Sequence, residues 1–332
     1  MIWLLGILLP FLFLLIIYLL GPKPETPNYE LSLPELPDHL FEIAEEIEKR
    51  EAAIDNIRPD NEARIIWSDV QAEETEYAIV YLHGFSASLG DGDPVHKEFA
   101  EYFSCNLYLP RLHAHGLSSE EPLLDFRQEE FLKSAVEALA VGRRIGKKVI
   151  LMGTSTGASL ALYLAAHFPD IHGLILLSPN VELFDKKTWL LSKPWGLQIA
   201  RMVLRDKYRR SETKEEKQSS YWDNTYRLEA AVQLKSMIEH TMSNKVFNGV
   251  KQPCLVGYYY KNEEEQDKTV SVPHILSMYK SLGTDPEWKR IRNFPEAGDH
   301  CIASSIWSAS WEEVRDECIS FAEEILGMER EK

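Results

Sequence analysis

The stretch from Lys148 to His167 reads KVILMGTSTGASLALYLAAH. Its first part, residues 148–152, is short, apolar and partly β-branched, which is typical of a buried strand. Its last part, residues 158–167, consists mostly of helix-forming residues and stops before Pro169, which predicts a helix. Between the two lies the pattern Gly-x-Ser-x-Gly, so Ser155 is predicted to lie on a sharp turn from a strand into a helix.

A serine on such a turn has a strained backbone and an exposed Oγ, as a nucleophile requires. Gly153 and Gly157 flank it because a side chain at either position would collide with the neighbouring strand or helix. Backbone N–H groups at the start of the helix point to where an oxyanion would form. An incidental glycine-rich turn is the alternative, and the strand before it and the helix after it favour the nucleophile.

The rest of the chain alternates between strand and helix patterns, which predicts an α/β protein with a mostly parallel central sheet and helices on both faces. The expected strands cover residues 64–67, 77–82, 106–109, 148–152, 173–177, 252–259 and 290–294. The expected helices cover residues 94–103, 123–145, 158–167, 272–282 and 308–326. The alternation pauses over residues 181–250, which is too long for a loop and predicts a helical insertion.

The N-terminus differs from the rest of the chain. Residues 2–20 are almost all large and apolar with no charge, and a helix of this length spans about 28 Å, close to the thickness of a bilayer core. This predicts a retained transmembrane anchor over residues 1–20, although a cleaved signal peptide is the competing interpretation. Lys23 after the span weakly favours a membrane-anchored protein with its catalytic domain in the cytoplasm. Residues 21–60 predict a proline-rich spacer followed by an amphipathic helix.

Composition excludes several classes of function. The net charge of −16 argues against nucleic-acid binding, since few phosphates would be neutralised. The four cysteines have no metal-type spacing, and the sequence has no His-Glu-x-x-His, P-loop or dinucleotide-binding pattern. We therefore expect neither a metal nor a cofactor, and chemistry carried by side chains alone.

A histidine follows the last expected strand, in the segment FPEAGDH that ends at His300. With this segment and the Gly-x-Ser-x-Gly turn, the chain resembles the α/β-hydrolase superfamily, and within it the capped esterases and monoacylglycerol-lipase-like enzymes. The resemblance implies an α/β-hydrolase core over residues 61–180 and 251–328, with residues 181–250 as a helical cap insertion. It also implies a serine hydrolase whose nucleophile, acid and histidine follow in that order along the chain.

The resemblance also implies individual roles. Ser155 would be the nucleophile, His300 the base, and Asp267, in the pattern Asp-x-x-Val, the acid. The oxyanion hole would consist of the backbone N–H of Phe85, which follows a His-Gly pair, and that of Thr156.

The acid is open to alternatives, because residues 261–266 are inserted before Asp267 and make this connection longer than the usual turn. Glu263, Glu264 and Glu265 are the runners-up, although a run of charges is usually a solvated loop. Asp299 adjoins His300 in sequence, so its side chain should point away. His83, the histidine of the His-Gly pair, is expected to be structural.

These inferences together predict a serine hydrolase of carboxylic esters, with lipid-like esters suggested by an anchor next to a capped site. Apolar residues of the insertion, such as Trp189, Leu191 and Leu197, either line an acyl pocket or form the ordinary buried face of cap helices. The alternatives are a thioesterase or peptidase on the same triad, and a non-catalytic scaffold that has kept the fold.

Overall fold

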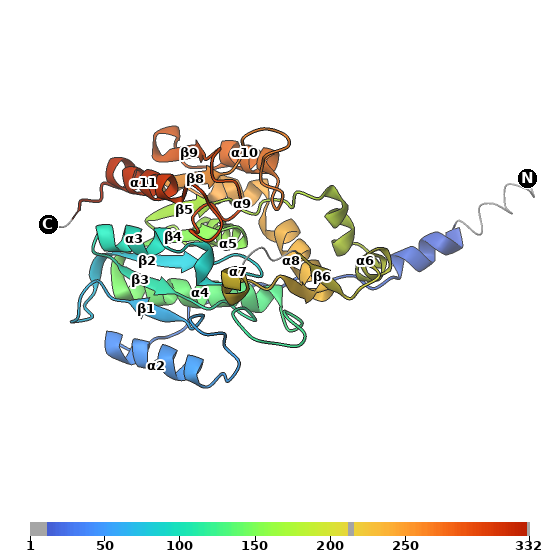
Figure 1. Cartoon of the computed structure of the whole chain (residues 1–332), viewed down its shortest axis with the longest axis horizontal. Coiled ribbons are helices and arrows are strands. Elements are labelled where there is room, and N and C mark those ends of the chain that lie inside the picture. The colour runs from blue at the N-terminus through green and yellow to red at the C-terminus, as the bar shows by residue number, and fades with distance from the viewer. Residues whose placement is uncertain (1–11, 212–215, 331–332) are drawn as a thin grey trace, which may run out of the picture.

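The computed structural model describes residues 12–211 and 216–330. Its centre is a seven-stranded sheet in the order β1-β3-β2-β4-β5-β8-β9 (Figure 1). The strands are β1 (Arg64–Ile66), β2 (Thr75–Leu82), β3 (Asn106–Leu109), β4 (Gly146–Thr154), β5 (Gly173–Leu177), β8 (Cys254–Tyr258) and β9 (Lys289–Asn293). β1 runs antiparallel to β3, and the other neighbours are parallel.

Helices cover both faces of this sheet (Figure 1). They are α2 (Leu40–Ala52), α3 (Val95–Tyr102), α4 (Gln128–Ile145), α5 (Thr156–His167), α10 (Val272–Ser281) and α11 (Trp311–Phe321). Short helical turns are η1 (Leu89–Asp91), η3 (Pro286–Trp288) and the π-helical turn η4 (Ala322–Leu326). The predicted α/β architecture, with a mostly parallel sheet between two helical layers, is confirmed.

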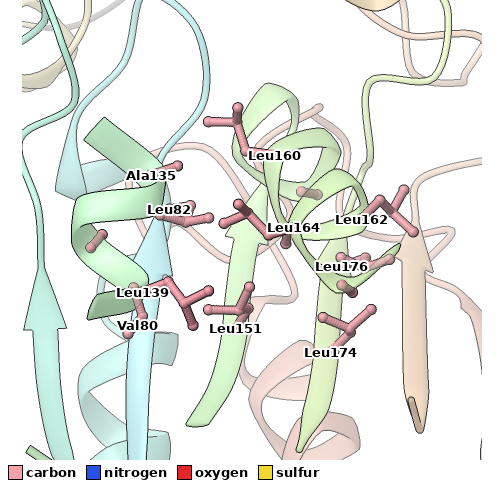
Figure 2. Close-up of a cluster of buried hydrophobic side chains, with 14 of the residues drawn as sticks. Val80, Leu82, Ala135, Leu139, Leu151, Leu160, Leu162, Leu164, Leu174 and Leu176 are labelled. Carbon is pink, nitrogen blue, oxygen red and sulfur yellow. The ribbon is translucent and has the colours of Figure 1, made fainter. Parts of the chain in front are cut away.

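Two apolar clusters fill the spaces between the sheet and its two layers. Along β2, Val80 and Leu82 belong to the cluster beneath α4 and α5, whereas Ile79 and Tyr81 belong to the cluster beneath α3 and α11. Successive strand residues point to opposite faces, and both faces are buried, so the central strands are apolar throughout. Figure 2 shows side chains of the first cluster from β2, α4, β4, α5 and β5.

Helix α5 is fixed firmly below the turn at Ser155. Leu160 and Leu164 are fully buried in the first cluster (Figure 2). Burial of one such leucine stabilises a fold by roughly 2 kcal/mol. The start of α5 is therefore held in place by packing along the length of the helix.

The chain between β5 and β8 forms helices and a separate two-stranded ribbon. Its elements are η2 (Lys186–Ser192), α6 (Gly196–Leu204), β6 (Tyr208–Arg210), α7 (Glu216–Tyr221), β7 (Thr225–Arg227), α8 (Leu228–Thr241) and α9 (Asn244–Gly249). β6 and β7 pair with each other and not with the main sheet. Met237 of α8 and Phe247 of α9 belong to the first core cluster, so these two helices join the core layer. We call the remaining part, residues 186–227, the cap segment.

The prediction of an N-terminal transmembrane helix over residues 1–20, and of a membrane-anchored location, is wrong. Within the two described ranges, no helix is both long and apolar enough to cross a bilayer. Among the described residues of this region, 12–19 are helical. The rest of that prediction falls on residues 1–11, which lie outside the described residues.

This end of the chain contacts the cap segment. The Trp195 backbone N–H donates to the carbonyl of Pro22 (2.8 Å), and its indole N–H donates to the carbonyl of Ile17 (3.1 Å). Gly21 lies against the same indole, where an added Cβ would approach Nε1 to 2.0 Å. Figure 1 shows the N-terminal helix projecting from the molecule beside α6.

Candidate active site

Ser155 lies between the last residue of β4 and the first residue of α5, with φ 55° and ψ −120°. This strained conformation is held by hydrogen bonds from the Ser155 N–H to Leu177 O (2.9 Å) and from the Asn180 N–H to Ser155 O (3.0 Å). A Cβ on Gly157 would lie 1.9 Å from the carbonyl oxygen of Leu82. The turn therefore needs glycine there, for the steric reason that the sequence suggests.

The structure joins Asp267 and His300 directly. His300 Nδ1 donates to Asp267 Oδ2 at 2.6 Å. The other oxygen of this carboxylate accepts the N–H groups of Thr269 (2.8 Å) and Val270 (2.9 Å). Asp267 is 1% exposed, and these three hydrogen bonds define the orientation of its carboxylate.

The six residues before Asp267 form a closed loop. Tyr260 and Gln266 pair across its base, and the Asp267 N–H donates to Tyr259 O (3.3 Å). The side chains of Glu263, Glu264 and Glu265 are exposed on this loop. The insertion thus projects outward and brings the chain back to the end of β8, where Asp267 meets His300.

The second ring nitrogen of His300, Nε2, is buried and has no hydrogen-bond partner in the described part of the chain. Burial lowers the pKa of His300, but the negative charges of Asp267, Asp299 and Asp91 outweigh that effect and leave the pKa above its ordinary value. The imidazole therefore has one nitrogen committed to a carboxylate, while the other is available to a reacting group.

The two predicted oxyanion donors lie in neighbouring segments. Phe85 follows β2, and Thr156 is the first residue of α5. Among residues 12–211 and 216–330, neither backbone N–H has an acceptor. Gly84, which precedes Phe85, lies close to Ser155: an added Cβ would lie 3.1 Å from Ser155 Cβ.

Two buried histidines hold the segment that contains Phe85. His83 Nδ1 donates to Gly84 O (2.9 Å), and its Nε2 accepts the Leu112 N–H (3.1 Å). His115 Nε2 accepts the Ser86 N–H at 2.9 Å. Burial lowers the pKa of His83 to about 4 and that of His115 well below its usual value, so both rings stay neutral acceptors. His83 has the structural role expected of it.

The cap segment contacts the segments that carry Phe85 and His300. The Asp223 N–H donates to Ser86 O (2.7 Å), and Trp222 packs in a small cluster with Ala87 and Cys301. Trp222 thus bridges the segments that carry Phe85 and His300. Ser155 itself is only 8% exposed. Asp223 in turn pairs with Arg58, whose Nη1 lies 3.2 Å from Asp223 Oδ1.

The apolar residues of the cap segment divide between two environments. Leu191 and Leu197 line a cavity of about 520 Å³ that they share with residues 22–25 and with α8. Trp189 is 52% exposed and Met202 71% exposed. The cap helices therefore do not present a fully buried apolar face.

Sequence reasoning missed Asp91, a buried carboxyl that accepts the Gly84 N–H, and the Arg58–Asp223 pair. The only available signal for Asp91 was an acidic residue in a glycine-rich loop after a strand, which is also an ordinary turn composition. Within the described ranges, no three His, Cys, Asp or Glu side chains gather closely enough to hold a metal ion.

Comparison with known proteins defines the class. Residues 79–312 match the model of the alpha/beta hydrolase family, and this covers more than half of the chain. The protein therefore belongs to the α/β-hydrolase family, as the resemblance seen in the sequence predicts.

The chain is similar to a thermostable monoacylglycerol lipase from a Bacillus species, with 28% identity over 114 residues, 34% of this chain and 44% of that lipase. It thus matches less than half the length of this curated relative. A solved structure from the metagenome-derived lipolytic enzymes LipS and LipT has a TM-score of 0.64, with 16% identity and coverage of 80% of this chain and 98% of the other. A soluble variant of monoglyceride lipase from Saccharomyces cerevisiae has a TM-score of 0.60, with 10% identity and coverage of 78% and 90%. At these identities the two structures support the fold alone.

Proposed function

We propose that this protein is a serine hydrolase that cleaves carboxylic esters through an acyl-enzyme intermediate, with Ser155, Asp267 and His300 as its catalytic triad. The 2.6 Å hydrogen bond between His300 Nδ1 and Asp267 Oδ2, with Nε2 left without a partner, is the observation that carries the proposal. This pair and the strained Ser155 all follow strands of the parallel sheet at their carboxyl ends, where ligand sites of such sheets occur.

Each step of the proposed reaction uses a group described above. Ser155 Oγ attacks the ester carbonyl carbon while its proton passes to His300 Nε2. The backbone N–H groups of Phe85 and Thr156 stabilise the oxyanion of the tetrahedral intermediate. When the intermediate collapses, His300 returns the proton to the leaving alcohol. Water then attacks the acyl-enzyme by the same route and releases the acid.

Asp267 supports this cycle electrostatically. Its carboxylate fixes the tautomer with a proton on Nδ1, and it stabilises the imidazolium that forms during attack. The raised pKa of His300 is the equilibrium expression of that stabilisation. The raised pKa also has a disadvantage, because the His300 ring must be neutral to act as a base. Activity is therefore lost when the pH falls below the pKa of His300.

We propose esters with an apolar acyl part as the substrate class. The similar proteins include a monoacylglycerol lipase, and this likeness is what supports the substrate class. The division of the chain into a core over residues 61–180 and 251–328 and a cap over 181–250 belongs to the same proposal.

The test is hydrolysis of p-nitrophenyl esters of increasing acyl length by the wild type and Ser155→Ala. We expect the variant to lose at least about 10⁴-fold in kcat and to lose labelling by a fluorophosphonate, while its unfolding transition is unchanged. Ser277→Ala, which removes an exposed hydroxyl from α10, is the matched control and should behave as wild type. Unchanged turnover in Ser155→Ala would remove this serine from the mechanism.

Matched ester, thioester and amide substrates separate the related activities. We expect the ester to have the highest kcat/KM. A clear preference for the thioester or amide would identify a thioesterase or a peptidase instead. A wild type that neither turns over any of the three nor reacts with the fluorophosphonate would indicate a scaffold with the hydrolase fold.

A further inference from the structure

A buried carboxyl outside the triad lies directly behind the segment that carries Phe85. Asp91, in η1, is 1% exposed. Its Oδ2 accepts the Gly84 N–H at 2.7 Å, and its Oδ1 accepts the Tyr81 hydroxyl at 2.6 Å. The Tyr81 hydroxyl also lies 2.8 Å from Thr154 Oγ1. We call these three side chains, Asp91, Tyr81 and Thr154, the Asp91 network.

The Asp91 network connects the two segments that carry the proposed oxyanion donors. Gly84 directly precedes Phe85, and Thr154 is the last residue of β4, two positions before Thr156. The Asp91 carboxyl accepts the Gly84 N–H directly, and it reaches Thr154 through the Tyr81 hydroxyl. This one carboxyl therefore contacts both segments, directly or through Tyr81.

The loop that carries Asp91 is also tied to the histidine segment. Ser304 Oγ donates to Gly90 O at 2.7 Å, and Pro94 pairs with Ser304 as an isolated bridge. Gly92 lies against the ring of Tyr81, where an added Cβ would approach the ring to 2.3 Å. The loop therefore has little freedom to move relative to His300 or to β2.

An ionisable group at this position is costly for folding. Burial raises the pKa of Asp91 to about 7, against the hydrogen bonds from Tyr81 and Gly84, which favour its charged form. Polar groups that cost stability are expected at functional sites rather than in the ordinary core. A carboxylate is also a stronger acceptor for a backbone N–H than a neutral group is.

We propose that Asp91 is a positioning residue for the oxyanion hole: it holds Gly84 and, through Tyr81, Thr154, and so sets the geometry of the Phe85 and Thr156 N–H groups. The inference rests on the proposed ester hydrolysis. Asp91 does not touch the substrate, and its effect is transmitted through the backbone that it holds.

The experiment compares Asp91→Ala, Asp91→Asn and Tyr81→Phe with the wild type on a short p-nitrophenyl ester. Active sites are counted by fluorophosphonate titration, so kcat refers only to folded, reactive enzyme. Because one misplaced oxyanion donor costs about 10²-fold, we expect Asp91→Ala to lose about that factor in kcat with KM nearly unchanged. In Asp91→Asn the amide oxygen can still accept the Gly84 N–H, so we expect its kcat to be at least about tenfold higher than that of Asp91→Ala.

A boronic acid inhibitor provides a second measurement. It forms a tetrahedral adduct on the serine, so its affinity should fall in Asp91→Ala by about the same factor as kcat. Asp93→Asn removes a carboxyl from the same loop, where its partner is Lys97 at 2.8 Å, and should leave both values within about twofold of wild type.

The outcomes separate a positioning role from a purely structural one. A kcat per titrated site within twofold of wild type in both Asp91→Ala and Tyr81→Phe would overturn the inference, even if fewer sites were titrated. If Asp91→Ala does not fold, Tyr81→Phe decides, with a fall of about tenfold expected in kcat but not in KM. A wild type without esterase activity would overturn the proposed function itself, and this inference with it.

Discussion

The carboxyl edge of the central sheet and the cap segment are held by different kinds of contact. At the edge, Ser155, Asp267 and His83 are fixed by hydrogen bonds to the backbone, and each is at least nine-tenths buried. In the cap segment, some of the contacts with the core are ionic and partly exposed, as between Lys207 and Glu121 (2.6 Å). Exposed ion pairs contribute little to stability, whereas buried backbone hydrogen bonds define position.

This difference matches the two tasks that the proposed function gives to the two regions. Groups that must be placed to within a fraction of an ångström lie on rigid strand ends and helix starts. The part expected to contact the substrate is attached by contacts that can break and reform at low cost. The predictions below test this comparison, from the largest expected effect to the smallest.

Asp267→Asn should have the largest effect. We expect kcat/KM to fall by about 10³- to 10⁴-fold, because the amide neither enforces the tautomer nor stabilises the imidazolium. Initial rates on a p-nitrophenyl ester measure this. Glu264→Gln, an exposed change on the preceding loop, should leave kcat/KM unaltered. A large loss in Glu264→Gln with none in Asp267→Asn would assign the acid to the loop instead.

The pH profile of Asp267→Asn sharpens the same assignment. In the wild type, Asp267 is the first of the charges that raise the pKa of His300 against the effect of burial. When that charge is removed, the pKa falls and the ring stays neutral to lower pH. The acidic limb of kcat/KM should therefore move to lower pH, and a shift to higher pH would contradict the assignment.

Two glycine variants compare the stability of the two regions. In Gly157→Ala the new Cβ would lie 1.9 Å from Leu82 O, and in Gly196→Ala it would lie 2.2 Å from Leu190 O. The clashes are similar, but Gly157 lies in the core and Gly196 begins α6. We expect Gly157→Ala to lower the free energy of unfolding by more than about 4 kcal/mol or to prevent folding. Urea denaturation measures both variants.

Gly196→Ala should have a smaller global effect, because the cap segment can shift without unfolding the sheet. We expect new sites of limited proteolysis near residues 186–204 and a nearly unchanged midpoint in urea. Equal losses in the two variants would show that cap and core unfold as one unit.

Acid should destabilise the edge of the sheet through His83. Burial lowers its pKa in the folded state to about 4, against about 6.5 when unfolded. Its contribution to stability is complete above about pH 6.5 and is lost as the pH falls toward about 4, because the unfolded chain takes up the proton first. This single group accounts for roughly 3 kcal/mol. His83→Gln, measured by urea denaturation across this range, should make the loss shallower, and an unchanged slope would contradict the prediction.

The smallest effect is expected at the attachment of the cap segment. Arg58→Met removes the partner of Asp223, whose pKa burial raises to about 6 even with Arg58 present. Without Arg58 that pKa rises further, so the unpaired charge is a penalty at alkaline pH and is relieved by protonation at acidic pH. We expect kcat/KM to fall by about tenfold at alkaline pH and by less at weakly acidic pH.

The control for this variant is Arg143→Gln, which breaks the ion pair with Asp170 (2.6 Å) away from the cap segment. It should change kcat/KM by less than about twofold. A similar loss in both variants, or a larger loss in Arg58→Met at acidic pH, would contradict the role of Asp223 as a cap attachment.

Local pattern was sufficient for most of the core. The strands predicted at 106–109 and 173–177 coincide with β3 and β5, and the turn at Ser155 has the positive φ that its flanking glycines suggest. Such elements are buried on both faces, so their apolar runs leave a clear signal in the sequence. The ribbon of β6 and β7 was not foreseen, because its residues are polar or charged and carry no apolar alternation.

The N-terminal segment shows where pattern alone was misleading. Its apolar composition predicts a membrane span, but no helix among the described residues is long and apolar enough for one, and residues 17–22 contact Trp195 of the cap segment. Hydropathy reports the cost of exposing a segment to water, and it does not say what that segment contacts in the folded chain.

The sequence by itself determined the α/β architecture, the family and the strained serine, because each depends on residues that are close together along the chain. Only the tertiary structure decided which acidic residue meets His300, which carboxyl holds Gly84, and that Arg58 pairs with Asp223. The bonded residues lie 33 positions apart in the first case and 165 in the last. A charge in a loop has the same local sequence signature whether it meets a buried partner or water, and folding alone distinguishes the two.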